Sequence, residues 1–269
     1  MINLDLAQLT AAVCGIATDA GNYLKEERRT FRREAVVEKH AHDYVSYVDK
    51  ASEKRIVSAL SALLPQAGFI TEEDTAVYRN EPCWWVVDPL DGTTNYIHDN
   101  APYCVSIALR NAEELLLGVV YEPCRNECFY GWKGGGAYRD GERLHVSDTD
   151  NIADALVVTE LPYNYRQYAH TARHLLEQLY GKVGGIRMNG SAALAICYVA
   201  AGRFDGWLES FIGKWDYSAA ALLVQEAGGE VTDFYGNSRF MEGHHIIASN
   251  GHLHPLLLQL AGEAMPAGM

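Results

Sequence analysis

One stretch of the sequence decides the fold and points to the chemistry: Trp84-Trp85-Val86-Val87-Asp88-Pro89-Leu90-Asp91-Gly92-Thr93-Thr94-Asn95. Two valines after two tryptophans are typical of the end of a buried strand. Two carboxylates follow, and carboxylate oxygens are the ligands that hard divalent cations prefer. Gly92-Thr93-Thr94 suits a tight turn that opens a helix, whose first backbone amides can bind a phosphate. The stretch therefore predicts metal-assisted phosphate chemistry.

The composition is that of an ordinary soluble globular protein, since 48% of the 269 residues are hydrophobic and 21% are charged. That length is enough for one large domain or for two fused lobes. The six cysteines are scattered, and nothing at the N-terminus resembles a signal peptide, so we expect reduced thiols in a cytoplasmic protein. No apolar run approaches the roughly 20 residues needed to cross a bilayer, so we expect no membrane partner.

The formal net charge of −13 disfavours nonspecific binding to nucleic acid or to anionic membranes, because such binding relies on clustered Lys and Arg. We therefore expect no nucleic-acid partner. An acidic surface also repels a phosphate substrate. Bound cations would reverse the sign of the field inside the site, so the charge is compatible with the predicted chemistry.

The hydrophobic pattern predicts helices and strands in mixed order. Apolar residues three and four positions apart predict helices at 4–29, 48–64, 166–180, 190–201, 215–227 and 252–264. Strand patterns lie at 31–39, 68–71, 84–88, 103–110, 114–121, 155–159 and 246–249, and a hairpin is expected with strands at 128–130 and 136–138. Such an order favours a layered α+β fold over a repeated βαβ unit. We expect a lobe boundary near residue 145, which divides the chain into residues 1–145, with most metal ligands, and residues 146–269.

Two further acidic segments extend the predicted site. Glu72 and Glu73 follow the short strand 68–71, and Asp216 stands at the start of the helix 215–227. Taken singly, acidic runs are usually solvated turns, and an aspartate at a helix start is usually an N-cap. Their occurrence together with Asp88 and Asp91 favours one shared site.

In combination, these segments resemble the inositol monophosphatase family of magnesium-dependent, lithium-sensitive phosphatases. The resemblance runs from about Asp43 to Ala248, and it includes Glu226-Ala227-Gly228-Gly229 after Trp215-Asp216. It implies an α+β fold, namely the layered αβαβα sandwich of the inositol monophosphatase and fructose-1,6-bisphosphatase type. It also implies a homodimer and two or three Mg²⁺ ions in each active site.

The resemblance implies a set of metal ligands. Glu72, Asp88 and the backbone carbonyl of Leu90 would bind one ion. Asp88, Asp91 and Asp216 would bind a second ion. Family members often have Ile where this chain has Leu90, and a carbonyl ligand tolerates that exchange. Glu73 would support the ligands from outside.

The resemblance also implies the groups that act on phosphate and water. Gly92 and Thr93 would present backbone amides to the phosphate, and the Thr93 hydroxyl with Glu72 would orient the attacking water. Asp49 would accept a hydrogen bond from Thr93. Asp43 and Asp49 belong to Asp43-Tyr44-Val45-Ser46-Tyr47-Val48-Asp49-Lys50, which resembles the family's Asp-Leu-Val-Thr-x-x-Asp-Lys.

The substrate expected from the resemblance is inositol monophosphate, hydrolysed to inositol and phosphate by direct attack of a metal-activated water. Two cations about 4 Å apart suit such an in-line displacement. Glu209 matches a carboxylate that binds ring hydroxyls, and Gly190, Ser191 and Ala192 match a segment that touches the same ring. Thr94-Asn95-Tyr96 resembles the inositol phosphatase branch, whereas the adenosine 3′,5′-bisphosphate phosphatases tend to have Thr-Lys-Glu-Phe.

Two alternatives remain. A 3′(2′),5′-bisphosphate nucleotidase or a fructose-1,6-bisphosphatase would have the same fold and ligands, because specificity depends on the shape of the pocket. A metal-binding regulatory scaffold without essential turnover is the alternative of another class. The complete set of presumed reactive residues argues against the scaffold: Glu72, Asp88, Asp91, Thr93 and Asp216.

Overall fold

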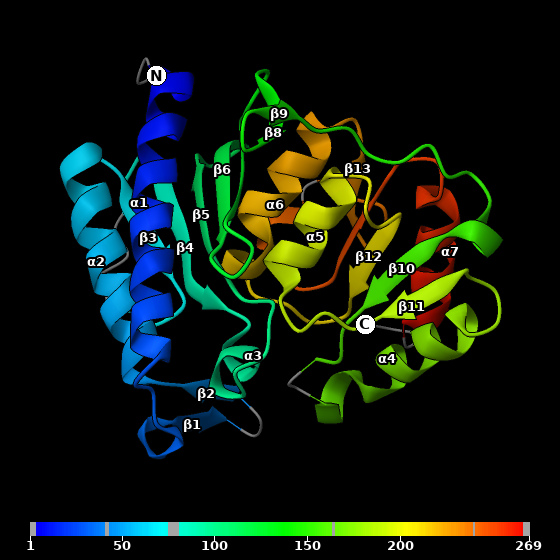
Figure 1. Cartoon of the computed structure of the whole chain (residues 1–269). Coiled ribbons are helices and arrows are strands. Elements are labelled where there is room, and N and C mark those ends of the chain that lie inside the picture. Colours follow the sequence, from blue (N-terminus) through cyan, green and yellow to red (C-terminus); the bar gives the residue numbers. More distant parts are fainter. Residues whose placement is uncertain (1–3, 41–42, 75–80, 163–164, 239, 266–269) are drawn as a thin grey trace.

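Two large β-sheets alternate with three layers of helices in the part of the chain that the computed structural model describes, residues 4–40, 43–74, 81–162, 165–238 and 240–265 (Figure 1). The first sheet has seven strands and the second has five. The layers follow the order helix, sheet, helix, sheet, helix. This arrangement confirms the predicted α+β fold with αβαβα layers.

The seven-stranded sheet has its strands in sequence order, β3 to β9. β3 and β4 are parallel, and every later neighbour is antiparallel. Every residue of β4 is buried, which is expected of a strand covered on both faces. The strands are β3 (Gly68–Thr71), β4 (Trp84–Asp91), β5 (Cys104–Arg110), β6 (Leu115–Glu122), β7 (Glu127–Trp132), β8 (Gly136–Arg139) and β9 (Glu142–Arg143).

Two long helices, α1 (Leu6–Arg28) and α2 (Tyr47–Leu63), cover the outer face of this sheet. Their apolar stripes pack on the β4 and β5 side chains that point outward, including Trp85 and Ile107. Ser46 and Asp49 form a capping box at the start of α2. That cap matters for the site, because it fixes the Asp49 carboxylate.

The five-stranded sheet has the order β11-β10-β12-β14-β13. β10 is parallel to β11 and to β12, whereas β14 is antiparallel to both of its neighbours. Helices α4 (Tyr165–Leu179) and α7 (His254–Ala264) cover its outer face. The strands are β10 (Leu156–Thr159), β11 (Gly185–Arg187), β12 (Gly206–Glu209), β13 (Glu230–Asp233) and β14 (Ile246–Ser249).

The central layer consists of α5 (Ala192–Ala200) and α6 (Lys214–Glu226), which pack against each other between the two sheets. α5 is buried from Ala193 to Ala200, and α6 from Tyr217 to Val224. One hydrophobic core therefore contains side chains of both sheets, such as Phe129 and Trp207. This continuous core fixes the N-termini of α5 and α6 against the first sheet.

The remaining elements are short. β1 (Val37–His40) and β2 (Asp43–Val45) form a hairpin, and α3 (Thr93–Ile97) follows β4. Three short 3₁₀ turns lie at Arg33–Ala35, Ile152–Asp154 and Phe240–Glu242. No helix within the described ranges combines the length and the apolar character that crossing a bilayer requires.

The sequence pattern was wrong in a few places. The segment 31–39 was predicted as a strand, but a 3₁₀ turn occupies Arg33–Ala35 and β1 begins only at Val37. The helix expected from residue 190 begins at Ala192, because Gly190 has a φ of +72°, which ends helical geometry. The strands β2, β11, β12 and β13 were not predicted, since they are short and lack an apolar run like those of β10 and β14. The lobe boundary near residue 145 stays a prediction.

Candidate metal centre and phosphate site

The end of β4 brings two carboxylates to one side of the sheet. In a regular strand, residues three positions apart point to opposite faces. The pairing of β4 with β5 is irregular here, because Asp88 lies opposite Ser106 whereas Asp91 lies opposite Cys104. An advance of three residues along β4 thus matches an advance of two along β5, which is a β-bulge. Prolines within sheets are tolerated at bulges. The bulge at Pro89 and Leu90 turns Asp88 and Asp91 toward the same space.

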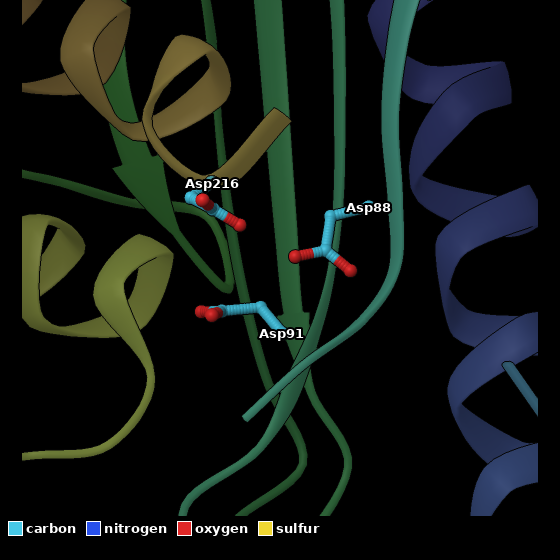
Figure 2. Close-up of side chains that lie close together, drawn as sticks. All are labelled: Asp88, Asp91 and Asp216. Carbon is cyan, nitrogen blue, oxygen red and sulfur yellow. The ribbon is translucent and has the colours of Figure 1, made fainter. Parts of the chain in front are cut away.

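Asp216 approaches these residues from the central helix layer. It is the third residue of α6, and its Oδ2 accepts a hydrogen bond from the Gly213 N–H at 2.8 Å. Asp88, Asp91 and Asp216 each offer one carboxylate oxygen, and these oxygens all lie within 4.8 Å of one another. Figure 2 shows the three carboxylates around a common space. The structure therefore brings together acids separated by more than a hundred residues.

The electrostatics of this cluster favour a cation. Asp88 is 1% exposed and Asp91 is 7% exposed. Burial raises the pKa of Asp88 well above its ordinary value, and the charges of Glu72, Asp91 and Asp216 raise it further. Buried like charges are costly unless something compensates them. An oxygen-only ligand set suits Mg²⁺, Ca²⁺ or Mn²⁺ rather than a soft metal, so the donors present fit a hard divalent cation.

Glu72 and Leu90 lie beside the cluster. Glu72 follows β3, its N–H donates to the Val87 carbonyl at 3.2 Å, and its side chain lines the same cavity as Asp88. The Leu90 carbonyl accepts a hydrogen bond from the Thr93 hydroxyl at 3.0 Å. The Glu73 N–H donates to Glu53 Oε2 at 2.8 Å, which holds the turn after β3. Asp43 begins β2, but its side chain lies outside the described part of the structure.

The turn after β4 has the backbone shape expected of a phosphate loop. Gly92 is the N-cap of α3 with a φ of +93°, and an added Cβ would lie 3.0 Å from the Gly190 carbonyl. The Thr93 hydroxyl donates to Asp49 Oδ1 at 3.1 Å. Asp49 Oδ2 accepts from the Ser46 N–H at 2.9 Å and from the Ser46 hydroxyl at 2.7 Å. The capping box of α2 thereby fixes the acceptor that orients Thr93.

The predicted substrate residues line the same cavity, which has a volume of about 920 Å³. Gly190, Ser191 and Ala192 form one wall, and Glu209 stands at the end of β12. Burial raises the pKa of Glu209 well above its ordinary value, with a further contribution from the charges of Glu160 and Asp216. A pocket of this size accommodates a sugar-alcohol phosphate and larger esters.

The sequence analysis missed Glu160, and it gave Asn95 no role in the site. Glu160 follows β10 and lines the cavity, and burial raises its pKa to about 7. Asn95 also lines the cavity, and its side-chain amide donates to the carbonyls of Pro102 and Asn189. An acid directly after a buried strand is the pattern that singled out Asp88, and it could have identified Glu160.

An apolar wall was also not predicted. It includes Leu161, Met188, Phe211, Ile212 and Trp215, which line the same cavity as the acids. These residues lie in loops, directly after strands and, for Trp215, in the first turn of α6, without a periodic pattern. Only the fold brings them together, so no signal in the sequence could have found them.

The layered fold and the carboxylate cluster define a class of metal-dependent enzymes, and the comparisons identify it. The chain belongs to the inositol monophosphatase family, whose model matches residues 5–265. The resemblance expected from the sequence is thus confirmed. This family is metal-dependent and acts on small phosphorylated substrates, and the three clustered aspartates provide a place for an ion.

Individual relatives agree on the family and differ in their names. A protein of Salmonella typhimurium named "Nus factor SuhB" is 40% identical over 90% of this chain and 91% of its own length. An inositol-1-monophosphatase of Rhizobium meliloti is 36% identical over 84% of this chain and 85% of its own. The solved inositol monophosphatase of Anabaena superposes with a TM-score of 0.87 at 32% identity, covering 98% of this chain and 99% of its own.

Proposed function

We propose that this protein is a Mg²⁺-dependent phosphomonoesterase that hydrolyses inositol monophosphate to inositol and phosphate. The observation that supports it most strongly is the approach of Asp88, Asp91 and Asp216 oxygens to within 4.8 Å of one another. They line one cavity with the glycine–threonine turn at Gly92 and Thr93. Metal-assisted phosphate hydrolysis requires at least a cation site next to a group that binds the phosphate.

The proposed ligands divide into two sets. Glu72, Asp88 and the Leu90 carbonyl would hold one Mg²⁺, and Asp88, Asp91 and Asp216 would hold a second. Bound there, the ions would activate water and stabilise the charge of the leaving alcohol. Glu73 and Asp43 support the ligands from outside.

Thr93 has the central role among the proposed catalytic side chains. Its hydroxyl proton is directed to Asp49 Oδ1 at 3.1 Å or to the Leu90 carbonyl at 3.0 Å. Its oxygen is therefore left as an acceptor, and a hydroxyl oxygen has two lone pairs. With Glu72, it holds the attacking water in line with the phosphate. The backbone amides of Gly92 and Thr93 bind the phosphate oxygens.

The alcohol part of the substrate lies between Glu209 and the segment Gly190–Ala192. Ser191 already donates its proton to Asp91 Oδ2 at 2.5 Å, so the Ser191 oxygen and the backbone of the segment are what remain for the alcohol. The Glu209 carboxylate accepts hydrogen bonds from ring hydroxyls. Ring hydroxyls are thus the group that distinguishes inositol monophosphate from simpler esters.

The test compares Glu209→Gln with wild type on two esters at saturating Mg²⁺. Inositol 1-phosphate has ring hydroxyls, and phenyl phosphate has none. We expect kcat/KM to fall about tenfold on inositol 1-phosphate, because a charged hydrogen bond of about 1.5–3 kcal/mol is replaced by a neutral one of about 0.5–1.5 kcal/mol, and to change little on phenyl phosphate. An equal fall on both esters would contradict the role of Glu209 in specificity. Exposed Glu177→Gln is the matched control.

A regulatory scaffold remains a second candidate, because relatives such as the Salmonella typhimurium protein are named Nus factors rather than phosphatases. The absence of a nucleic-acid partner therefore stays a prediction, and the net charge is its only support. Complementation of a strain that lacks this protein distinguishes the two candidates. If turnover is the essential function, a folded but inactive Asp216→Asn variant does not restore growth, whereas the wild-type protein does.

The remaining expectations are proposals of the same kind. We propose a cytoplasmic homodimer that is inhibited by lithium and has no membrane partner, organised as lobes 1–145 and 146–269 around one catalytic site. The net charge of −13 supports the absence of an anionic-membrane partner. Light scattering gives the oligomeric state, and lithium titration of the phosphatase activity gives the inhibition.

A further inference from the structure

The turn between β11 and α5, formed by Asn189 and Gly190, is held by a carboxylate. Glu160 Oε1 accepts hydrogen bonds from the Asn189 N–H at 2.6 Å and the Gly190 N–H at 3.1 Å. One carboxylate oxygen thus binds two successive backbone amides, and hydrogen bonds to an ionised acceptor are among the stronger ones. Gly190 has a φ of +72°, a conformation that few residues other than glycine adopt.

The residues directly after this turn bind Asp91. The Ser191 hydroxyl and the Ala193 N–H donate to Asp91 Oδ2 at 2.5 and 2.9 Å. The Ala192 N–H donates to Asp91 Oδ1 at 3.2 Å. Both carboxylate oxygens of Asp91 are therefore oriented by three consecutive residues. Displacement of the turn would displace the donors and rotate the carboxylate.

Asn95 holds the same turn from the side of the first sheet. Its side-chain N–H groups donate to the Pro102 carbonyl at 2.8 Å and to the Asn189 carbonyl at 3.1 Å. The turn is consequently fixed by Glu160 from the second sheet and by Asn95 from α3. Neither of these side chains is hydrogen-bonded to Asp91 in the described hydrogen bonds, so an effect that depends on hydrogen bonds passes through the turn. The charge of Glu160 also acts directly on Asp91, and a variant without that charge separates the two effects.

We propose that Glu160 is a positioning residue, which holds the Asn189–Gly190 turn and through it the orientation of Asp91, and so sets the affinity of the carboxylate cluster for a divalent cation. The inference rests on the proposed function in that Asp91 is taken as a metal ligand. Partners that orient a ligand from outside typically change metal affinity or activity by about 10- to 100-fold when they are removed.

The experiment measures Mn²⁺ binding to the full chain by electron paramagnetic resonance. Mn²⁺ takes the same oxygen ligands as Mg²⁺ and needs no substrate. We expect Glu160→Ala to raise the Kd for Mn²⁺ about tenfold or more. Glu160→Gln keeps an oxygen acceptor at the same place and should recover most of the lost affinity. Glu177→Ala removes an exposed carboxylate from α4 and should bind as wild type does.

Several outcomes would overturn the inference. A folded Glu160→Ala protein with wild-type Mn²⁺ affinity would limit Glu160 to a structural role, and thermal unfolding without metal establishes that the variant is folded. Equal impairment in Glu160→Gln and Glu160→Ala would mean that charge, and not the held turn, is what matters.

Asn95→Ala provides a test should Glu160→Ala not fold, because it loosens the turn from the opposite side. We expect weaker Mn²⁺ binding, and wild-type affinity would break the link between the turn and Asp91. The experiments distinguish a failure of this inference from a failure of the proposed function. A wild-type protein that binds Mn²⁺ but releases no phosphate from inositol 1-phosphate refutes the function and leaves the role of Glu160 intact.

Discussion

Substitution of Asp91 distinguishes an effect on folding from an effect on catalysis, since Asp91 is both a buried hydrogen-bond acceptor and a proposed metal ligand. In Asp91→Asn, the amide oxygen can take the place of Oδ2 and keep the hydrogen bonds from Ser191 and Ala193. The amide nitrogen then faces the Ala192 N–H, where Oδ1 stood at 3.2 Å. Two donors that face each other cost about 1–3 kcal/mol.

An opposing effect limits that loss. Burial raises the pKa of Asp91, which means that the folded state disfavours its charged form. Asparagine removes this charge, although it also gives up a favourable interaction of about 0.3–1 kcal/mol with the N-terminus of α5. The costs together are at most about 4 kcal/mol without metal, the removal of the buried charge reduces them, and each kcal/mol lowers the Tm by about 2–4 °C in a chain of this size. The variant should therefore fold.

Its turnover should be lost. Removal of a supporting partner of a metal ligand already costs about 10- to 100-fold, so loss of the ligand itself should cost at least about 100-fold in kcat. The assay is the initial rate of phosphate release over a range of Mg²⁺ concentrations, with thermal unfolding in parallel and the exposed Asp150→Asn as the matched control. Wild-type turnover by Asp91→Asn at the same Mg²⁺ concentration would refute the assignment of Asp91.

Three further predictions concern single residues. Gly92→Ala should lower the Tm and the turnover, because an L-residue at a φ of +93° costs about 1–2 kcal/mol and its Cβ would crowd the Gly190 carbonyl; an unchanged Tm speaks against a required conformation. Thr93→Val should lower kcat more than it changes KM, whereas Thr93→Ser should retain the hydroxyl and most of the activity; equal kinetics of the two variants would remove Thr93 from the mechanism. Burial raises the pKa of Glu122 from 4.5 to about 7, so the folded state holds a proton that the unfolded chain releases, and stability falls as pH rises from 4.5 to 7. Glu122→Gln should therefore raise the Tm more at pH 8 than at pH 5, and a pH-independent difference would contradict this.

The local elements were largely predictable from the sequence. Long amphipathic helices such as α1 and the buried strand β4 have strong periodic or apolar patterns, and the structure has them within a few residues of the predicted bounds. The short strands β11 and β12 have no such pattern, because tertiary pairing rather than local sequence makes them strands.

The clustered aspartates of the candidate site were predictable, but its geometry and its apolar wall were not. The resemblance supplied Asp88, Asp91 and Asp216, yet the sequence did not show the bulge that turns Asp88 and Asp91 to one side. It likewise did not show that Asp91 binds the start of α5. Such contacts join segments a hundred residues apart, and only the packing of the central helices between the two sheets determines them.

The most direct test of the central claim is phosphate release from inositol 1-phosphate, adenosine 3′,5′-bisphosphate and fructose 1,6-bisphosphate, with and without Mg²⁺ and with added lithium. The predicted result is Mg²⁺-dependent release that is inhibited by lithium and has its highest kcat/KM on inositol 1-phosphate. Preference for another ester would keep the metal mechanism and overturn the substrate. No release from any of the three, with Mg²⁺ shown to be bound, would contradict the claim that this carboxylate cluster is a phosphatase site for these esters.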